Sequence, residues 1–172
     1  MTHDQTKQSM LFYINNLISQ PIGDEMKGSL AGWIADYWER LFNAQCPDHV
    51  CSFRGGEDIA AKMIRTALQN ETIVDITQRG YEPLFDSICD LFHIPAEFQP
   101  PLRFYFVMEK YRPMIDFYRD IVQNNDDRRY LGFSRIMSYI TNTSESVIKK
   151  AAARSSSDGS LLIYTFPNAK FC

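Results

Sequence analysis

Apolar residues recur along most of this chain at the three- and four-residue intervals of amphipathic helices. The first stripe runs from Leu11 to Ile18 after a polar start, and Pro21 and Gly23 then interrupt it. A second and stronger stripe begins after Asp24. Its members are Met26, Leu30, Trp33, Ile34, Tyr37, Trp38, Leu41 and Phe42. This spacing places each set on one face of a helix, so two helices are predicted before residue 43.

The two tryptophans of the second stripe are predicted to be core residues. Trp33 and Trp38 share a face with several aliphatic side chains. Large rings in that position bury much apolar area when the helix packs against its neighbours. An aromatic docking surface is the alternative interpretation of the same stripe.

The middle of the chain continues with a loop, a helix and one ambiguous segment. Residues 44–56 show no period and are predicted to form a loop. A helix starts near Gly56, where Glu57 and Asp58 suit the positive end of the helix dipole. Its apolar face consists of Ile59, Met63, Ile64, Ala67 and Leu68. The apolar residues of 71–77, ETIVDIT, fit either a short strand or an extended connector.

Residues 84–92 predict another helix with an apolar and a polar side. The apolar residues are Leu84, Phe85, Ile88, Leu91 and Phe92. Asp86, Asp90 and His93 cluster on the opposite side from most of them, because residues three and four apart share a helix face. A solvated polar face accounts for this arrangement.

The last third of the chain adds further helices. A proline-rich joint at 93–101, HIPAEFQPP, precedes the helical pattern of 102–123. Pro113 lies inside that pattern and predicts a kink or two helices meeting, because proline removes a backbone hydrogen bond. After a turn, another apolar face follows: Phe133, Ile136, Met137 and Ile140. Together the patterns predict a mainly α fold, a bundle of six to seven helices with one or two short strands.

Charge divides the chain at the same joint. Residues 1–100 hold 7 Lys/Arg and 14 Asp/Glu, whereas residues 101–172 hold 11 and 7. We predict an acidic helical lobe at 1–95 and a basic helical lobe at 96–172, or one continuous domain with two differently solvated faces. The net charge of −3 favours no particular partner, and the apolar runs are too short for a membrane span. No membrane partner is therefore predicted.

The segment 133–166 has the order helix, tight turn, helix, loop, strand. Asn142 and Glu145 form a capping-box-like pair at the start of the second helix. Asp158-Gly159 then interrupts the pattern before SLLIYTF, whose β-branched and aromatic residues favour a strand. This order resembles winged-helix domains, in which the strand belongs to the wing hairpin.

The resemblance implies a binding surface. In winged-helix DNA binders the second helix enters the major groove, and nearby basic residues contact phosphates. For this chain, the resemblance implies that the residues contacting the groove are Ser144, Ser146, Lys149, Lys150 and Arg154. It implies that the residues contacting phosphates are Arg128, Arg129 and Arg135. Winged helices are also common protein-interaction modules, and in that case the same surface docks a protein.

Sequence motifs for catalysis are missing. The chain has no GxxxxGK[ST], GxGxxG, HExxH or GxSxG pattern. The only local set suited to nucleophilic catalysis is Cys89 and His93 with Asp86 or Asp90. A solvated helix face explains that set equally well, so we predict no enzyme, no catalytic residue and no cofactor.

The cysteines and histidines offer a structural zinc site as an alternative. Cys46, His49 and Cys51 lie in one loop, and Cys89 and His93 are four residues apart on a predicted helix. These residues could supply four sulfur and nitrogen ligands. Neither spacing is a CxxC knuckle, and a histidine at a helix end stabilises the dipole without a metal, so no metal is predicted.

The start of the chain and the four cysteines predict a cytoplasmic protein. The first residues lack the basic region and apolar core of an export signal. Cys46, Cys51, Cys89 and Cys172 are therefore expected to be reduced thiols, and a disulfide between Cys46 and Cys51 is not expected.

The leading functional prediction is a non-enzymatic protein–protein interaction module: an adaptor, an inhibitor or a regulatory domain. Aromatic residues and methionines without a catalytic set are typical of protein interfaces. The first alternative is a nucleic-acid-binding regulator that uses the basic C-terminal region. The second is a small metal-binding protein or enzyme that uses the cysteines and histidines.

Overall fold

The computed structural model describes residues 3–52, 56–123 and 132–157, with the side chains of 4–52, 56–123 and 132–151. These residues form nine α-helices and no strand. The mainly α class is confirmed, with more helices than the six to seven predicted. Within 71–77 the strand alternative is wrong, because the segment is an extended connector that buries Ile76. The predicted strand at 160–166 lies outside the described residues.

The helices of the first half include one that the sequence did not predict. Their bounds are α1 His3–Ile18, α2 Asp24–Phe42, α3 Asp48–Cys51, α4 Glu57–Gln69 and α5 Pro83–Leu91. The short α3 lies in the predicted loop, where its single turn buries Val50 against the core. A one-turn helix carries too few apolar positions to produce a recognisable period.

The second half contains tightly connected short helices. They are the 3₁₀-helix η1 Ala96–Phe98, α6 Gln99–Lys110, α7 Arg112–Phe117, the π-helix η2 Tyr118–Gln123, α8 Phe133–Thr141 and α9 Glu145–Ser157. The predicted break at Pro113 is confirmed as two helices meeting. Pro113 stands in the first turn of α7, where its missing N–H has no helical partner to lose.

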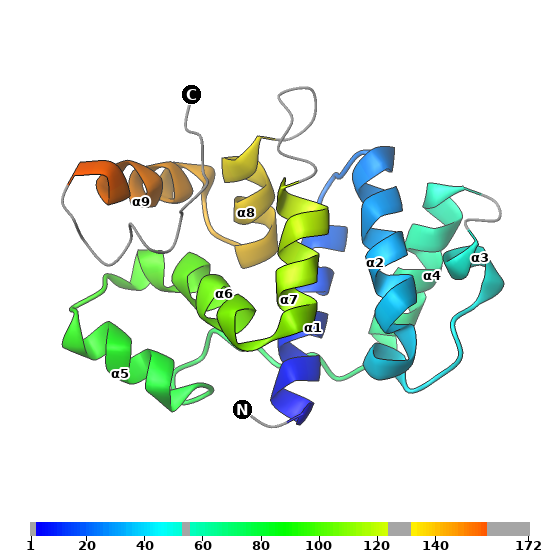
Figure 1. Cartoon of the computed structure of the whole chain (residues 1–172), viewed down its shortest axis with the longest axis horizontal. Coiled ribbons are helices and arrows are strands. Elements are labelled where there is room, and N and C mark those ends of the chain that lie inside the picture. The colour runs from blue at the N-terminus through cyan, green and yellow to red at the C-terminus, as the bar shows by residue number, and fades with distance from the viewer. Residues whose placement is uncertain (1–2, 53–55, 124–131, 158–172) are drawn as a thin grey trace.

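Helix α1 connects two groups of helices. Figure 1 shows α2, α3 and α4 on one side and α5, α6, α8 and α9 on the other, with α1 and α7 between them. Helix α1 packs on α2, α4 and α8, and the side-chain amide of Asn16 donates to the carbonyl of Ile140 at 2.9 Å. The core therefore includes residues from both sides of the proline-rich joint.

Aromatic rings fill the centre of this core. Phe104 of α6 is fully buried and lies 5.0 Å from the Tyr13 ring and 6.3 Å from the Phe117 ring, centre to centre. Both tryptophans of α2 are core residues, as predicted, with Trp33 3% exposed and Trp38 5% exposed. Phe104 thereby links α6 and α7, which follow one another, to α1, which is far from both in the sequence.

A polar contact joins α2 to α7 at the edge of the core. The Tyr37 hydroxyl donates to Oδ2 of Asp116 at 2.8 Å. Burial, together with this hydrogen bond, raises the pKa of Tyr37 to about 12. The phenol is therefore neutral at physiological pH and acts as a donor.

The turn between α8 and α9 differs from the predicted capping box. Asn142 adopts a left-handed conformation, with φ 51°, and ends α8 instead of starting α9. The carbonyl of Ser144 accepts from the N–H groups of Val147 and Ile148, so α9 begins after Ser144. Asparagine is favoured both at helix starts and in left-handed helix ends, so the local sequence does not decide between the two.

Candidate functional site

Helix α5 turns Asp86, one residue of its predicted polar side, toward the protein, whereas Asp90 and His93 of that side are exposed as predicted. Phe85 and Cys89 are buried, and the side chain of Asp86 is only 14% exposed. Leu84 is 56% exposed and Leu91 is 72% exposed. The predicted solvation of Asp86 is therefore wrong. Figure 1 shows this helix at the outer edge of the molecule, where it packs on α6.

A buried arginine explains the inward position of Asp86. Arg103 of α6 is 2% exposed, and its Nη2 donates to Oδ1 of Asp86 at 2.9 Å. The backbone N–H of Gly80 donates to Oδ2 of the same carboxylate at 2.6 Å. The guanidinium also lies 4.3 Å from the centre of the Phe85 ring. Because an unpaired buried charge costs several kcal/mol, the requirement of Arg103 for a carboxylate turns Asp86 inward.

The end of α5 is closed by a hydrogen-bond pattern of the Schellman type. His93 adopts a left-handed conformation with φ 50°. The N–H of Ile94 donates to the carbonyl of Cys89 at 2.9 Å, and the N–H of His93 donates to that of Asp90 at 3.2 Å. This closure fixes the last turn of the helix and holds Phe92, 52% exposed, next to Leu91.

The outward side of α5 is a continuous apolar stripe, which we call the α5 ridge: Leu84, Ile88, Leu91 and Phe92. Two ion pairs involve residues next to the ridge in sequence. Arg79 pairs with Asp90, and Lys110 pairs with Glu82 at 3.3 Å. An apolar centre with charged neighbours is the usual composition of a protein interface.

The predicted nucleic-acid residues are only partly brought together. Arg135 and Lys149 both bind Glu145, at 3.4 Å and 2.7 Å, and the Lys149 hydrogen bond together with Arg135 lowers the pKa of that carboxyl. Lys150 is exposed nearby. The remaining candidates are Ser144 and Ser146, whose hydroxyl oxygens lie 3.1 Å apart, and Arg154, Arg128 and Arg129, whose side chains lie outside the described residues. Glu145 therefore pairs with two of the predicted cations and offsets one of their two positive charges.

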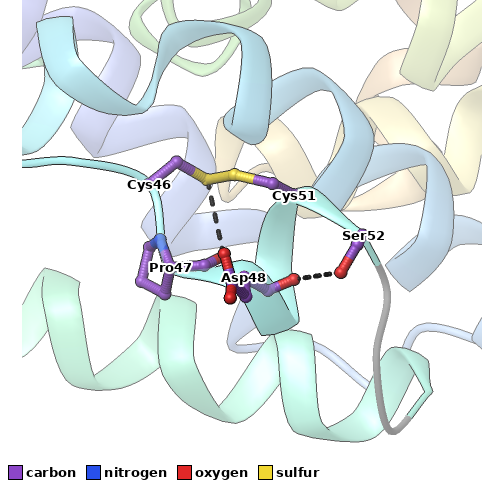
Figure 2. The surroundings of a disulfide bond; sticks show 5 residues. All are labelled: Cys46, Pro47, Asp48, Cys51 and Ser52. Carbon is purple, nitrogen blue, oxygen red and sulfur yellow. Dashed lines mark hydrogen bonds between the residues drawn. A yellow bond between two sulfur atoms is a disulfide. The ribbon is translucent and has the colours of Figure 1, made fainter.

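Cys46 and Cys51 form a disulfide, contrary to the expectation of reduced thiols. Figure 2 shows the bond joining Cys46, which lies just before α3, to Cys51, the last residue of α3, with a Cα–Cα distance of 6.3 Å. Cys46 is half-buried and Cys51 is exposed. The Ser52 hydroxyl donates to the carbonyl of Asp48 at 2.5 Å and closes the single turn of α3. One turn of helix brings the two sulfurs together, which spacing alone does not reveal.

Removing this disulfide is expected to lower the free energy of unfolding by about 2 kcal/mol. The two cysteines are 5 residues apart in sequence, and closing so small a loop restricts the unfolded chain only moderately. Urea unfolding with and without a reductant measures the difference. The double variant Cys46→Ala/Cys51→Ala is the control and should not respond to reductant. An equal response in both proteins would contradict the prediction.

The five candidate ligands of the described ranges, Cys46, His49, Cys51, Cys89 and His93, do not form a group that could hold a metal. The described residues contain no group of three or more His, Cys, Asp or Glu side chains that could hold an ion. Cys46 and Cys51 are joined to each other, and burial raises the pKa of the Cys89 thiol. His49 and His93 are both exposed, on α3 and after α5. Zinc ligation would require thiolates and histidines that meet in one place.

No helix within the described ranges combines the length and apolarity needed to cross a membrane. Comparison of the chain with protein-family models, with curated proteins and with solved structures finds no match. A functional proposal for this protein therefore rests on its own structure.

Proposed function

We propose that this protein is a non-enzymatic protein–protein interaction module that binds its partner through the α5 ridge. The observation that supports the proposal is the exposure of Leu84, Leu91 and Phe92 on one side of one short helix. The other strongly exposed large apolar residues of the described ranges are Ile59, Val74 and Ile115, which lie on separate elements. Scattered apolar residues are ordinary on a surface, whereas a gathered set indicates a contact site.

The shape of the ridge indicates the kind of partner. Its residues occupy positions i, i+4, i+7 and i+8, which are the anchor positions of a helix lying in an apolar groove. A standard interface buries about 800 Å² on each partner, which is more than four side chains provide. We therefore propose a partner protein with an apolar groove, in which the ridge forms the centre of the contact and polar side chains around it form the rim.

The double substitution Leu84→Asp/Leu91→Asp is expected to weaken partner binding at least tenfold. Carboxylates placed in an apolar groove lose hydration without gaining a partner, and central apolar anchors carry most of the energy of an interface. The measurement is quantitative affinity capture from native lysate with mass spectrometry, using wild type, the double variant and Ile59→Asp. Ile59 is 42% exposed on α4 and serves as the matched control.

Three observations together would support the proposal. A partner is retained by wild type and by Ile59→Asp, is lost from the ridge variant, and the circular dichroism and melting temperature of that variant stay close to wild type. Equal capture by the ridge variant, or equal loss from Ile59→Asp, would contradict it. Both side chains are exposed, so substitution leaves the core untouched.

A nuclease-treated arm tests the nucleic-acid alternative in the same experiment. That alternative stays a prediction, and the pairing of Arg135 and Lys149 with Glu145 weakens the positive field on which it depends. Capture that disappears after nuclease treatment would favour it. A cytoplasmic location also stays a prediction, and the Cys46–Cys51 disulfide is of a kind more common in oxidising compartments.

A further inference from the structure

The disulfide between Cys46 and Cys51 lies at the surface of the molecule. Both cysteines line one open groove of about 1090 Å³, whose walls come mainly from the second half of α2 and from the segment that contains α3. Cys51 is exposed and Cys46 is half-buried. A disulfide reacts with a thiol only where a sulfur can be approached from solvent, and Cys51 offers that access.

The fold adds only moderately to the strength of this bond. The two cysteines are 5 residues apart in sequence, so the bond closes a small ring. Folding and disulfide formation stabilise each other by the same factor, and that factor falls with the size of the ring. Here the folded protein is expected to be only about thirtyfold harder to reduce than the unfolded chain. The bond is therefore open to exchange with thiols in the native state.

Helix α3 has contacts that keep its place when the bond opens. Val50 is fully buried, and α3 packs on both α2 and α4. The carbonyl of Pro47 lies 3.8 Å from Sγ of Cys46, and it accepts a hydrogen bond from this thiol in the reduced protein (Figure 2). The two sulfurs therefore stay close together after reduction, and the bond forms again when a small disulfide is supplied.

The groove beside the bond carries an excess of negative charge. Three exposed acidic residues line it: Asp36, Glu39 and Asp48. The basic residues of its walls are Arg40 and Lys7, and Lys7 is already paired with Glu71 at 2.8 Å. A groove lined mainly by one sign of charge concentrates ions of the opposite sign. A positively charged thiol is therefore drawn toward the sulfurs, whereas an anionic thiol is repelled.

We propose that Cys46 and Cys51 form a redox exchange site for thiols that carry positive charge, and that Cys51 is the sulfur attacked. The thiolate of the reagent bonds to Sγ of Cys51, and the Cys46 sulfur leaves with the electron pair of the broken bond and takes up a proton. A second thiolate then attacks the reagent sulfur of this mixed disulfide, and Cys51 leaves and is protonated. The protein is reduced to two thiols while two reagent thiols are oxidised to one disulfide.

This inference is independent of partner binding through the α5 ridge. Figure 1 shows α2 and α3 on one side of α1 and α5 on the other. A protein that keeps its partner and fails to exchange thiols, or the reverse, therefore separates the two proposals.

Reduction by cysteamine and by 3-mercaptopropionate tests the charge preference. Both are small monothiols, and near neutral pH the first carries an ammonium group and the second a carboxylate. Cysteamine at about 20 mM is expected to open the bond in the native protein, as measured by alkylation of the new thiols and mass spectrometry. The ratio of the two reduction rates is expected to fall at least threefold in Asp36→Asn/Glu39→Gln. Comparing the same ratio in two proteins cancels the different reactivities of the reagents.

A matched control variant changes the same charge elsewhere. Glu97→Gln/Glu109→Gln also removes two exposed carboxylates, but these lie on η1 and α6, away from the groove. Its rate ratio is expected to equal that of wild type.

Single cysteine variants identify the sulfur that reacts. Cystamine, the disulfide of cysteamine, forms a mixed disulfide with a free cysteine, and peptide mapping assigns the adduct to its residue. Cys46→Ser is expected to form the adduct on Cys51 at least tenfold faster than Cys51→Ser forms it on Cys46, because Cys51 is exposed and Cys46 is half-buried.

Three results would overturn the proposal. The first is a bond that resists cysteamine in the native protein and opens only in urea. The second is a rate ratio that stays the same in Asp36→Asn/Glu39→Gln, or that falls equally in the control. The third is adduct formation at equal rates on Cys46 and Cys51.

Discussion

Replacing Arg103 with methionine is expected to lower the free energy of unfolding by about 3–5 kcal/mol. Methionine has a similar length and keeps the apolar contact with Phe85, so the loss comes mainly from charge. The carboxylate of Asp86, 14% exposed, is left without its cation and keeps only the N–H of Gly80. Urea unfolding followed by circular dichroism measures the change.

The double variant Arg103→Met/Asp86→Leu is the control for this experiment. Replacing both members of a buried ion pair by apolar residues is often close to neutral, so the double variant should recover most of the lost stability. A single variant within about 1 kcal/mol of wild type would show that the pair does not hold α5 in this orientation. The outward position of the α5 ridge would then lose its structural explanation.

Phe104→Ala is expected to cost a comparable 3–5 kcal/mol. The ring is fully buried, and it contacts the rings of Tyr13, Tyr105 and Phe117 in edge-to-face geometry. Its removal leaves a cavity between helices that are fixed by their other contacts, so the surrounding side chains relax only partly. The measurement is again chemical denaturation, with the slope of the transition checked for a change in cooperativity.

Leu91→Ala is the matched control for the core variant. It also shortens an apolar side chain, but Leu91 is 72% exposed, so we expect a change within about 0.5 kcal/mol. A loss above 2 kcal/mol would mean that Leu91 is covered in solution. Comparing Phe104→Ala with Leu91→Ala therefore tests both the position of the core and the exposure of the ridge.

Most of the helices could be predicted from the sequence because helix formation depends on residues close together in the chain. The stripe of α2 and the buried position of both tryptophans follow from spacing alone. Proline ended α6 and opened α7 for a steric reason that needs no tertiary contact. The left-handed Asn142 shows the limit, since the same residue type serves at either end of a helix.

The candidate site depends on contacts between residues far apart in the chain. Arg103 is 17 residues from Asp86, and neither position has a pattern that links it to the other. A hydrophobic period indicates that α5 is amphipathic, but it does not indicate which side meets the protein when a buried charge competes with apolar burial. The exposure of Leu84, Leu91 and Phe92 follows from that competition.

The amino-acid sequence by itself determined a mainly helical protein, the positions of its main breaks and the residues of its largest core helix. These features depend on the geometry of a single helix and on the steric limits of proline. Only the tertiary structure decided the inward position of Asp86 on α5, the disulfide between Cys46 and Cys51 and the pairing of Glu145 with Arg135 of the preceding helix. Each of these results from charge or sulfur chemistry between side chains that the fold brings together, and periodicity carries no information about such pairs.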